Sequence, residues 1–197
     1  MDSEQDQPSI EESATILCRH CGLCCMGAVF SYVEVSSEEK KSLSNLGFSI
    51  HEKPQNRHFF NLPCRQFHLG VCGIYPDIPG KCSDYRCRLL KRLQKDKIEL
   101  LDALAIADET IDLALNVSRL MNKSGSHNWK KINLKDRIYK AVRTKPENRT
   151  LIRAIKKYLQ QLDRDFQDQR LLKEIPKNQQ SIKLNIILGA PKEREKN

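Results

Sequence analysis

Long apolar runs are missing from this sequence. No stretch of its 197 residues approaches the roughly 18 consecutive apolar residues that a membrane-spanning helix needs. The first residues, MDSEQDQPSIEES, also lack the basic start and apolar run of a secretory signal. We therefore expect a cytoplasmic protein without a membrane span. In that reducing compartment, cysteines remain thiols unless a metal or a catalytic role claims them.

The sequence also lacks the motifs of several familiar enzyme classes. It contains no H-E-x-x-H, no P-loop and no G-x-S-x-G. His58 and His68 flank Cys64 and could approach a metal centre, but exposed loop histidines are the simpler interpretation. His20, beside the first cysteines, is more typical of a ligand's neighbour than of a ligand. Whether the protein is an enzyme stays open, and no catalytic residue is predicted.

Positive charge is concentrated in one part of the chain. The formal net charge is +9, of which residues 1–13 carry −5, residues 14–122 carry +2 and residues 123–197 carry +12. The first segment has one sign of charge and low hydrophobicity, which predicts a disordered acidic tail. The last segment favours an anionic partner, either nucleic acid or an acidic protein, although a solvated helical face is the simpler explanation.

All eight cysteines lie in the first half of the chain. They are Cys18, Cys21, Cys24, Cys25, Cys64, Cys72, Cys82 and Cys87. The spacing C-x2-C-x2-C-C is typical of knuckles that bind zinc or iron–sulfur clusters, and Gly22 suits such a turn because it can adopt a positive φ. Disulfides would need an oxidising compartment, and a buried-thiol role explains only one or two of the eight. We therefore predict a metal centre, with all eight cysteines as candidate ligands.

The identity of the metal stays open at this point. Two tetrahedral zinc sites of four thiolates each would use all eight cysteines. The triplet Cys18, Cys21 and Cys24 also has the C-x2-C-x2-C rhythm of ferredoxin loops, so an iron–sulfur cluster fits equally well. The side chains of adjacent Cys24 and Cys25 diverge along the backbone. They would serve different ions, unless one of them is a core residue.

A strand and a helix are expected between Cys25 and Cys64. Val29–Val35 is rich in β-branched and aromatic residues and predicts a strand. Ser36 and Glu39 are spaced as a capping box, which predicts a helix of roughly ten residues that ends near Gly47. Phe48 to Leu62 is expected to be extended or looped.

Helical periodicity dominates after the last cysteine. Apolar residues recur at helical spacing from Ile98 to about Asn122, and a shorter helix is predicted over Leu134–Arg143. A third helix is expected to have Pro146 in its first turn and an apolar stripe from Leu151 to Phe166. Residues 182–188 alternate as in a strand.

These patterns predict an α+β fold in which a small, loop-rich, cysteine-ligated module precedes a mainly helical carboxy-terminal region. The predicted parts are a disordered acidic tail at 1–13, a metal-binding module at 14–95, and a basic helical region at 96–197 that packs on the module. Within the module, residues 63–87 alternate cysteine with proline and glycine, which suits tight loops.

Further residues around the cysteines complete a recognisable pattern. C-x2-C-G-x-C-C is followed by C-x7-C-x-I-Y, Pro-x2-C and Y-x-C, formed by Cys18, Cys21, Gly22, Cys24, Cys25, Cys64, Cys72, Ile74, Tyr75, Pro79, Cys82, Tyr85 and Cys87. This pattern, over about residues 18–90, resembles the CxxCxxCC cysteine-cluster family of zinc- or iron-chelating (YkgJ-like) proteins.

The resemblance implies metal chelation and little else, because the biochemical role of the family is mostly undefined. Some relatives are linked to flagellin lysine methylation, but this sequence has no glycine-rich pocket for a methyl donor, so that activity is not transferred. The family usually has Arg-Pro before the seventh cysteine, whereas this chain has Ile78 and Pro79. Lys81 or Arg86 would then have to neutralise the thiolate charge.

Three functions are compatible with the sequence. The first is a metal-binding protein whose zinc or iron–sulfur centre is structural, since it stabilises loops that cannot fold by core burial alone. The second is an iron–sulfur redox or electron-transfer component. The third is a nucleic-acid- or protein-binding adaptor that uses the basic carboxy-terminal helices.

Overall fold

The computed structural model describes residues 8–68, 71–75, 77–123, 133–143 and 148–166. These residues form seven helices and five short strands. In chain order the elements are α1 (Ile10–Cys21), β1 (Tyr32–Val35), α2 (Ser37–Asn45), β2 (Ile50–Lys53), β3 (Arg57–Asn61), β4 (Phe67–His68), β5 (Val71–Cys72), α3 (Gly80–Asp84), α4 (Arg88–Leu93), α5 (Leu100–Lys123), α6 (Leu134–Arg143) and α7 (Arg149–Asp165).

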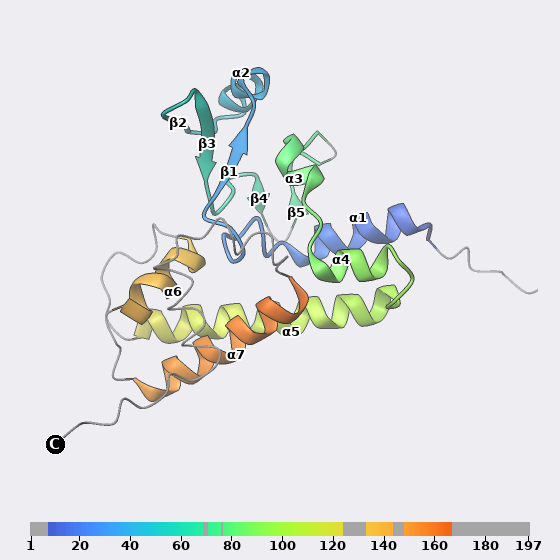
Figure 1. Cartoon of the computed structure of the whole chain (residues 1–197), viewed down its shortest axis with the longest axis vertical. Helices are drawn as coiled ribbons and strands as arrows, with labels where there is room; N and C mark the ends of the chain where they lie inside the picture. Colours follow the sequence, from blue (N-terminus) through green and yellow to red (C-terminus); the bar gives the residue numbers. More distant parts are fainter. Residues whose placement is uncertain (1–7, 69–70, 76, 124–132, 144–147, 167–197) are drawn as a thin grey trace, which may run out of the picture.

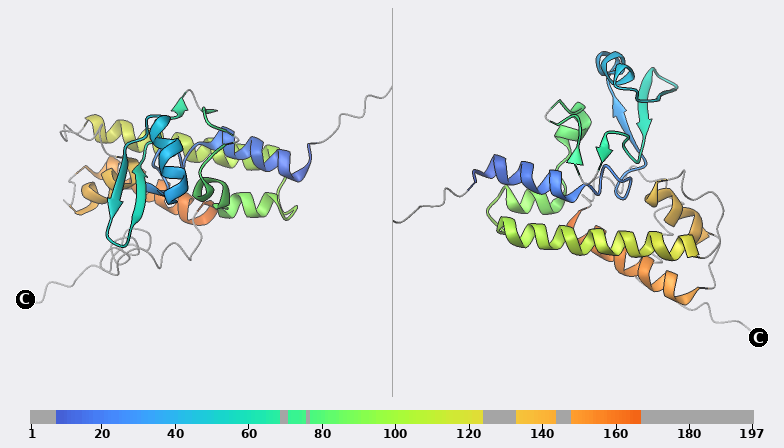
Figure 2. Two further views of the ribbon diagram at one scale, coloured as in Figure 1. Left: turned by 90° about the horizontal axis from the view of Figure 1, so that it is seen from above. Right: turned by 180° about the vertical axis from the view of Figure 1, so that it is seen from behind.

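The elements form a helical layer with a smaller mixed region on one side of it (Figure 1). Helices α1, α4, α5, α6 and α7 make the layer, and the three-stranded sheet with α2 stands above it. Helix α3 and the β4–β5 hairpin also lie on this side, next to α1, in both views of Figure 2. The predicted α+β fold with a helical carboxy-terminal region is therefore confirmed.

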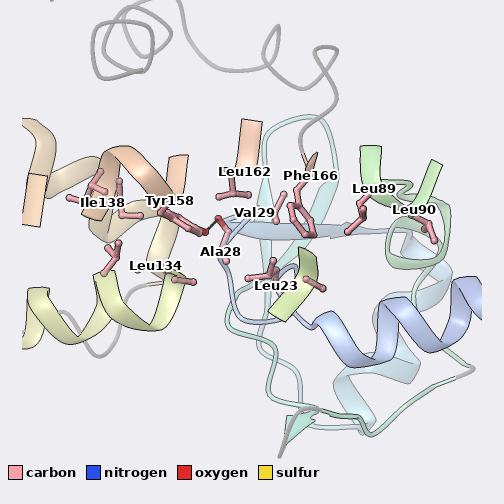
Figure 3. Close-up of a cluster of buried hydrophobic side chains, with 14 of the residues drawn as sticks. Leu23, Ala28, Val29, Leu89, Leu90, Leu134, Ile138, Tyr158, Leu162 and Phe166 are labelled. Atoms are coloured by element: carbon pink, nitrogen blue, oxygen red, sulfur yellow. Dashed lines mark hydrogen bonds between the residues drawn. The ribbon is translucent and has the colours of Figure 1, made fainter. Parts of the chain in front are cut away.

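The larger hydrophobic core joins the helices of the layer. Helix α5 lies against both α1 and α7, and its buried Ala103, Ala107 and Ala114 allow close approach because their side chains are small. Residues at helical spacing on α7 are buried in the same core, as Figure 3 shows for three of them: Leu151, Ile155, Tyr158, Leu162 and Phe166. The apolar stripe predicted for this helix is thus its core face, except that Ile152 is exposed.

The smaller core lies beneath the three-stranded sheet. Strand β3 is central and pairs antiparallel with β1 and β2, so that Val33, Phe60 and Ile50 share one face. Phe60 is buried against four other residues of this cluster, which are Val35, Leu43, Phe48 and Leu62. Five buried side chains are few, so this region depends on its contacts with the rest of the molecule.

Local sequence signals correctly predicted several elements. The capping box of α2 is present, because the Ser36 side chain accepts from the Glu39 amide and the Glu39 side chain accepts from the Ser36 amide. Helix α6 has the predicted bounds, and α5 begins at Leu100 rather than Ile98. No helix in the described part of the chain has the length and apolar character needed to span a membrane.

Other predictions were wrong. Helix α1 begins at Ile10, inside the stretch predicted as a disordered tail, because Ser9 and Glu12 form a second capping box. The strand predicted at Val29–Val35 is limited to β1, and Val29 is a buried core residue outside it.

The last helix also differs at its start. Helix α7 begins at Arg149, where the Asn148 side chain caps it by accepting from the Leu151 amide. Pro146, the predicted first-turn residue, and the predicted strand at 182–188 lie outside the described residues.

Candidate metal centre

The first two cysteines lie on a helix, not on the knuckle turn that their spacing predicted. Cys18 and Cys21 are three residues apart on α1 and therefore lie on one helix face. Gly22 ends the helix in the left-handed conformation (φ +57°), and its amide donates to the Cys18 carbonyl at 3.4 Å. The predicted positive φ of Gly22 is confirmed, but it terminates a helix.

Cys24 and Cys25 lie in a tight turn directly after α1. Backbone hydrogen bonds close this turn, from Met26 to Gly22 at 2.9 Å and from Ala28 to Leu23 at 3.0 Å. The same turn is joined to a distant part of the chain, since the amide of Cys64 donates to the carbonyl of Cys25 at 2.7 Å. A backbone hydrogen bond therefore joins the turn that carries Cys24 and Cys25 to the segment that carries Cys64.

The β4–β5 hairpin brings the sixth cysteine to the same place. Phe67 pairs with Cys72 across the hairpin, and the Phe67 amide donates to the Cys64 carbonyl at 3.2 Å. The Phe67 ring packs directly on Gly22, where a Cβ atom would lie 2.1 Å from the ring. Gly22 is therefore needed twice, for its positive φ and for this close approach.

The last two cysteines belong to two short helices, Cys82 in the middle of α3 and Cys87 at the start of α4. Cys82 is in α3, whose first residue, Gly80, donates its amide to the Glu39 carboxylate at 2.7 Å. Cys87 caps α4, because its sulfur accepts from the Leu90 amide at 3.3 Å. Helix α4 packs against α1, which places Cys87 near the helix that carries Cys18 and Cys21.

We group the eight cysteines by which of their thiolate forms repel one another most. Cys24 interacts most strongly with Cys21 and Cys87, and Cys25 interacts most strongly with Cys64 and Cys72. We name these groups the first thiol set, which is Cys18, Cys21, Cys24 and Cys87, and the second thiol set, which is Cys25, Cys64, Cys72 and Cys82. The two sets overlap, because Cys25 also repels Cys18, Cys21 and Cys24, and its effect on Cys24 is larger than that of Cys18.

None of the eight cysteines is in a disulfide; Cys18 and Cys82 are exposed, and the other six are half-buried. Burial raises the pKa of Cys21, Cys25 and Cys82 to about 12 and the pKa of Cys87 to about 11. Burial also raises the pKa of Cys24 well above its usual value. Four negative charges are therefore unfavourable in each set unless a cation accompanies them.

Several local groups nevertheless favour the thiolate form. Backbone amides donate to the sulfurs of Cys21, Cys64 and Cys87, and each such bond lowers the thiol pKa. The Arg86 guanidinium opposes the effect of burial on the pKa of Cys18. Arg86 is, with Lys81, one of the two residues that the sequence offered for neutralising thiolate charge.

None of the described histidines forms a metal-holding group with the cysteines. The Nε2 atom of His20 lies 2.6 Å from the Asp108 carboxylate of α5, and His68 is exposed on β4. His58 was expected to be an exposed loop residue, which is wrong. It is buried on β3, with Nε2 3.4 Å from the Glu52 carboxylate, because its register places it on the core face of the sheet. His127 lies outside the described residues.

The cysteines lie near one another, but this does not by itself give their side chains the geometry of a metal site. Within the residues that the structure describes, no group of three or more His, Cys, Asp or Glu side chains is arranged to hold a metal ion. The two thiol sets are defined by backbone contacts and by repulsion between their charges. A change of χ1 rotamer would re-aim a cysteine sulfur without moving the backbone.

Tyrosines around the thiols were only partly foreseen. The Tyr75 hydroxyl lies 3.1 Å from Thr15 Oγ1 of α1, and the Tyr85 hydroxyl donates to the Phe166 carbonyl at 2.6 Å. Tyr158 was predicted only as part of an apolar stripe. It is fully buried, its hydroxyl donates to the Ala28 carbonyl at 3.1 Å (Figure 3), and its charge would be repelled by Cys24 and Cys21. A hydroxyl within an apolar stripe was the signal for this role.

Comparison with known proteins gave no match: no protein-family model fits the chain, and no curated protein or solved structure is similar to it.

Proposed function

We propose that this protein binds metal through its two thiol sets. The observation that carries the proposal is that eight free cysteines, from separate stretches of chain, lie close enough for their thiolate forms to repel one another. Four thiolates complete the tetrahedral shell of a structural zinc ion, and the same number holds one iron–sulfur cluster. A buried-thiol role would not require the cysteines to come together in fours.

The electrostatics of the thiols support the proposal. Burial opposes the charged form of Cys21, Cys24 and Cys87, whereas amide donors at Cys21 and Cys87 favour it. A metal ion resolves this conflict, because it deprotonates its thiol ligands and balances their charge. The amide donors then stabilise the bound thiolates, as they do in metal knuckles.

The proposal includes zinc and iron–sulfur as alternatives, because soft thiolates bind both. If the metal is an iron–sulfur cluster, an electron-transfer role follows as the alternative function. Membership of the CxxCxxCC family stays a prediction, and so does an anionic partner for the basic region. Exposed Arg149, Arg153 and Lys157 on α7 are where such a partner would bind.

Metal analysis of the full chain, purified without oxygen, tests the proposal. We expect either a colourless protein with close to two zinc ions per chain or a brown protein that contains iron and acid-labile sulfide. Cys21→Ser should lower the metal content, while His20→Ala, one residue away on the same helix, should not. If the purified full chain contains no metal and has eight titratable thiols, the proposal is refuted.

A further inference from the structure

We infer that the outer face of the three-stranded sheet, together with the pocket at its end, binds single-stranded nucleic acid. Bases stack on the aromatic rings of this face, and the cations beside the rings pair with the phosphates. The inference goes beyond metal binding and does not depend on it, because the surface contains none of the eight cysteines.

The outer face of the sheet carries aromatic side chains where a solvated sheet usually carries polar ones. Phe60 of β3 lies on the core face, so Phe59 lies on the outer face, opposite Glu34 of β1 and His51 of β2. Tyr32 of β1 shares this face. Tyr32 is 38% exposed, and His51 is exposed as well. Apolar groups that gather on an exposed face, rather than standing singly, mark interaction sites.

The three outer rings form a row across the three strands. The ring centroids of Tyr32 and Phe59 are 5.3 Å apart, and those of Phe59 and His51 are 5.4 Å apart with an interplanar angle of 32°. The sheet that carries them projects from the helical layer (Figure 1). Aromatic rings fixed side by side on a sheet suit successive bases of a single strand, because every base has a π face that can stack on them.

The charges beside the rings suit a phosphate backbone. Lys53 Nζ lies 3.8 Å from the centroid of the Tyr32 ring and 4.5 Å from that of Phe59. Arg57 on the same face is paired with Glu34, whereas Lys53 forms no ion pair with a carboxylate of the described residues. A base that stacks on these rings displaces the ammonium group, which then pairs with the adjoining phosphate.

A pocket of about 260 Å³ continues this surface where β3 ends and β2 begins. The rings of Phe48 and Phe60, with centroids 4.7 Å apart, form its apolar side. Its polar lining comes from Ser49, His51, Asn61 and Arg65. Because His51 belongs to both the pocket and the row of rings, the two parts are continuous. The volume is just below that of pockets for drug-sized ligands and suits a single base.

Arg65 supplies a fixed cation at this pocket. Its guanidinium donates to the Gly47 carbonyl, and a Cβ atom on Gly47 would lie only 2.9 Å from Arg65 Nη1. Its other N–H groups can donate to a phosphate. With Lys53, Arg57 and Glu34, the surface has three bases and one acid, a net charge of +2. An acidic peptide would use these cations but not the rings, so single-stranded nucleic acid fits the surface better.

Fluorescence anisotropy of the full chain with a labelled single strand of about ten nucleotides, as RNA and as DNA, tests the inference. We expect single strands to bind at least about tenfold more tightly than a duplex of the same sequence, because paired bases cannot stack on the protein. Affinity should fall as salt rises. Binding of either single strand supports the inference, and the ratio of the two affinities identifies the preferred class.

Variants assign the binding to this face. Phe59→Leu keeps an apolar side chain on the sheet but removes the ring, and it should weaken binding at least about fivefold, while Phe59→Trp should restore it to within about twofold. Lys53→Gln should lower the slope of log affinity against log salt by about 0.7. The controls are Lys41→Gln, an exposed lysine of α2, and Arg153→Gln on α7, which should leave affinity unchanged.

Several results would overturn the inference. One is equal affinity for single strands and duplex. Another is affinity that is unchanged in Phe59→Leu and lowered in Arg153→Gln, which would place the nucleic acid on α7. Absence of single-strand binding would also overturn it and leave the proposed metal binding standing. Circular dichroism checks the fold of each variant; should Phe59→Leu fail to fold, Lys53→Gln and Arg65→Gln still decide, because unchanged affinity and salt slope in both would contradict the inference.

Discussion

The two thiol sets offer the same chemistry with different mechanical support. The first set lies among long helices that share the larger core, whereas the second lies on a two-stranded hairpin, a loop, one turn of helix and, for Cys25, the same turn after α1 that carries Cys24. Each set contains four thiols whose charged forms repel one another. The comparison teaches that the behaviour of a metal site depends on the elements that carry its ligands as much as on the ligands themselves.

Besides the turn that carries both Cys24 and Cys25, the sets meet where the Phe67 ring of the hairpin covers Gly22 at the end of α1. The Cys25–Cys64 backbone hydrogen bond lies beside this contact in the chain. Changes at this junction should affect both sets, while changes elsewhere should affect only one.

Proton competition should produce the largest effect on both sets. Binding must displace a proton from each ligating thiol, because burial keeps the pKa of Cys21, Cys25 and Cys82 at about 12 and that of Cys87 at about 11. Lowering the pH therefore weakens metal binding. With four protons displaced, zinc affinity should fall by up to about ten-thousand-fold per pH unit.

Competition titrations with a zinc chelator at about pH 6 and about pH 8 measure this slope. A slope near one proton per ion would mean that most ligands are not thiols, and it would contradict the assignment of four cysteines to each site.

Gly22→Ala should be the most damaging single substitution at the junction. A Cβ atom would meet the Phe67 ring at 2.1 Å, and the backbone has a φ of +57°, which an alanine rarely adopts. We expect a loss of about 3 kcal/mol in the free energy of unfolding, measured with urea, from strain and overpacking together.

Gly80→Ala is the matched control. Its Cβ would lie 3.6 Å from Glu39 Oε1, which is an ordinary contact, and its φ is not in the left-handed region. The expected change is within about 0.5 kcal/mol. Equal losses in the two variants would show that the junction has no special role.

Tyr158→Phe tests how firmly α7 holds the segment that follows Cys24 and Cys25. The substitution removes the hydrogen bond to the Ala28 carbonyl and leaves that carbonyl without this buried donor. We expect a loss of about 1–2 kcal/mol in the free energy of unfolding, measured with urea.

Tyr75→Phe removes a half-buried hydroxyl contact to Thr15 and serves as the comparison. It should cost about 0.5 kcal/mol in the free energy of unfolding. A larger loss of stability in Tyr75→Phe than in Tyr158→Phe would refute the expected difference between the tyrosines.

Glu39→Gln should give the smallest effect and act on the second set alone. Burial by itself would raise the pKa of Glu39, but hydrogen bonds from the Ser36 and Gly80 amides outweigh it and the pKa is lowered. The glutamine can accept only one of these bonds well, so α3 should loosen at a cost of about 1 kcal/mol.

The control for this variant is Glu12→Gln, which alters the capping box of α1 in the same way. Hydrogen exchange of the α3 amides should quicken in Glu39→Gln only. Unchanged exchange there would mean that Glu39 does not hold α3 in place.

Local signals predicted much of the fold. The capping box at Ser36 and the apolar periodicity of α5, α6 and α7 depend on residues within a few positions of one another, and sequence reveals such patterns directly. The Ser9–Glu12 capping box carried the same signal, but its acidic surroundings favoured a disordered interpretation.

The division of the cysteines could not be predicted in the same way. It depends on long-range contacts, such as the Cys25–Cys64 hydrogen bond and the packing of α4 on α1, and no spacing rule encodes these. The burial of His58 was missed for a related reason, because strand register decides which face a residue occupies. The sequence therefore indicated the candidate ligands but not their partners.

X-ray absorption spectroscopy at the edge of the bound metal tests the central claim most directly. For zinc we predict a first shell of four sulfur atoms at about 2.3 Å; an iron–sulfur cluster would give sulfur at about the same distance together with a short iron–iron vector. A first shell of nitrogen and oxygen atoms, at about 2.0 Å, would contradict the claim that the thiols hold the metal.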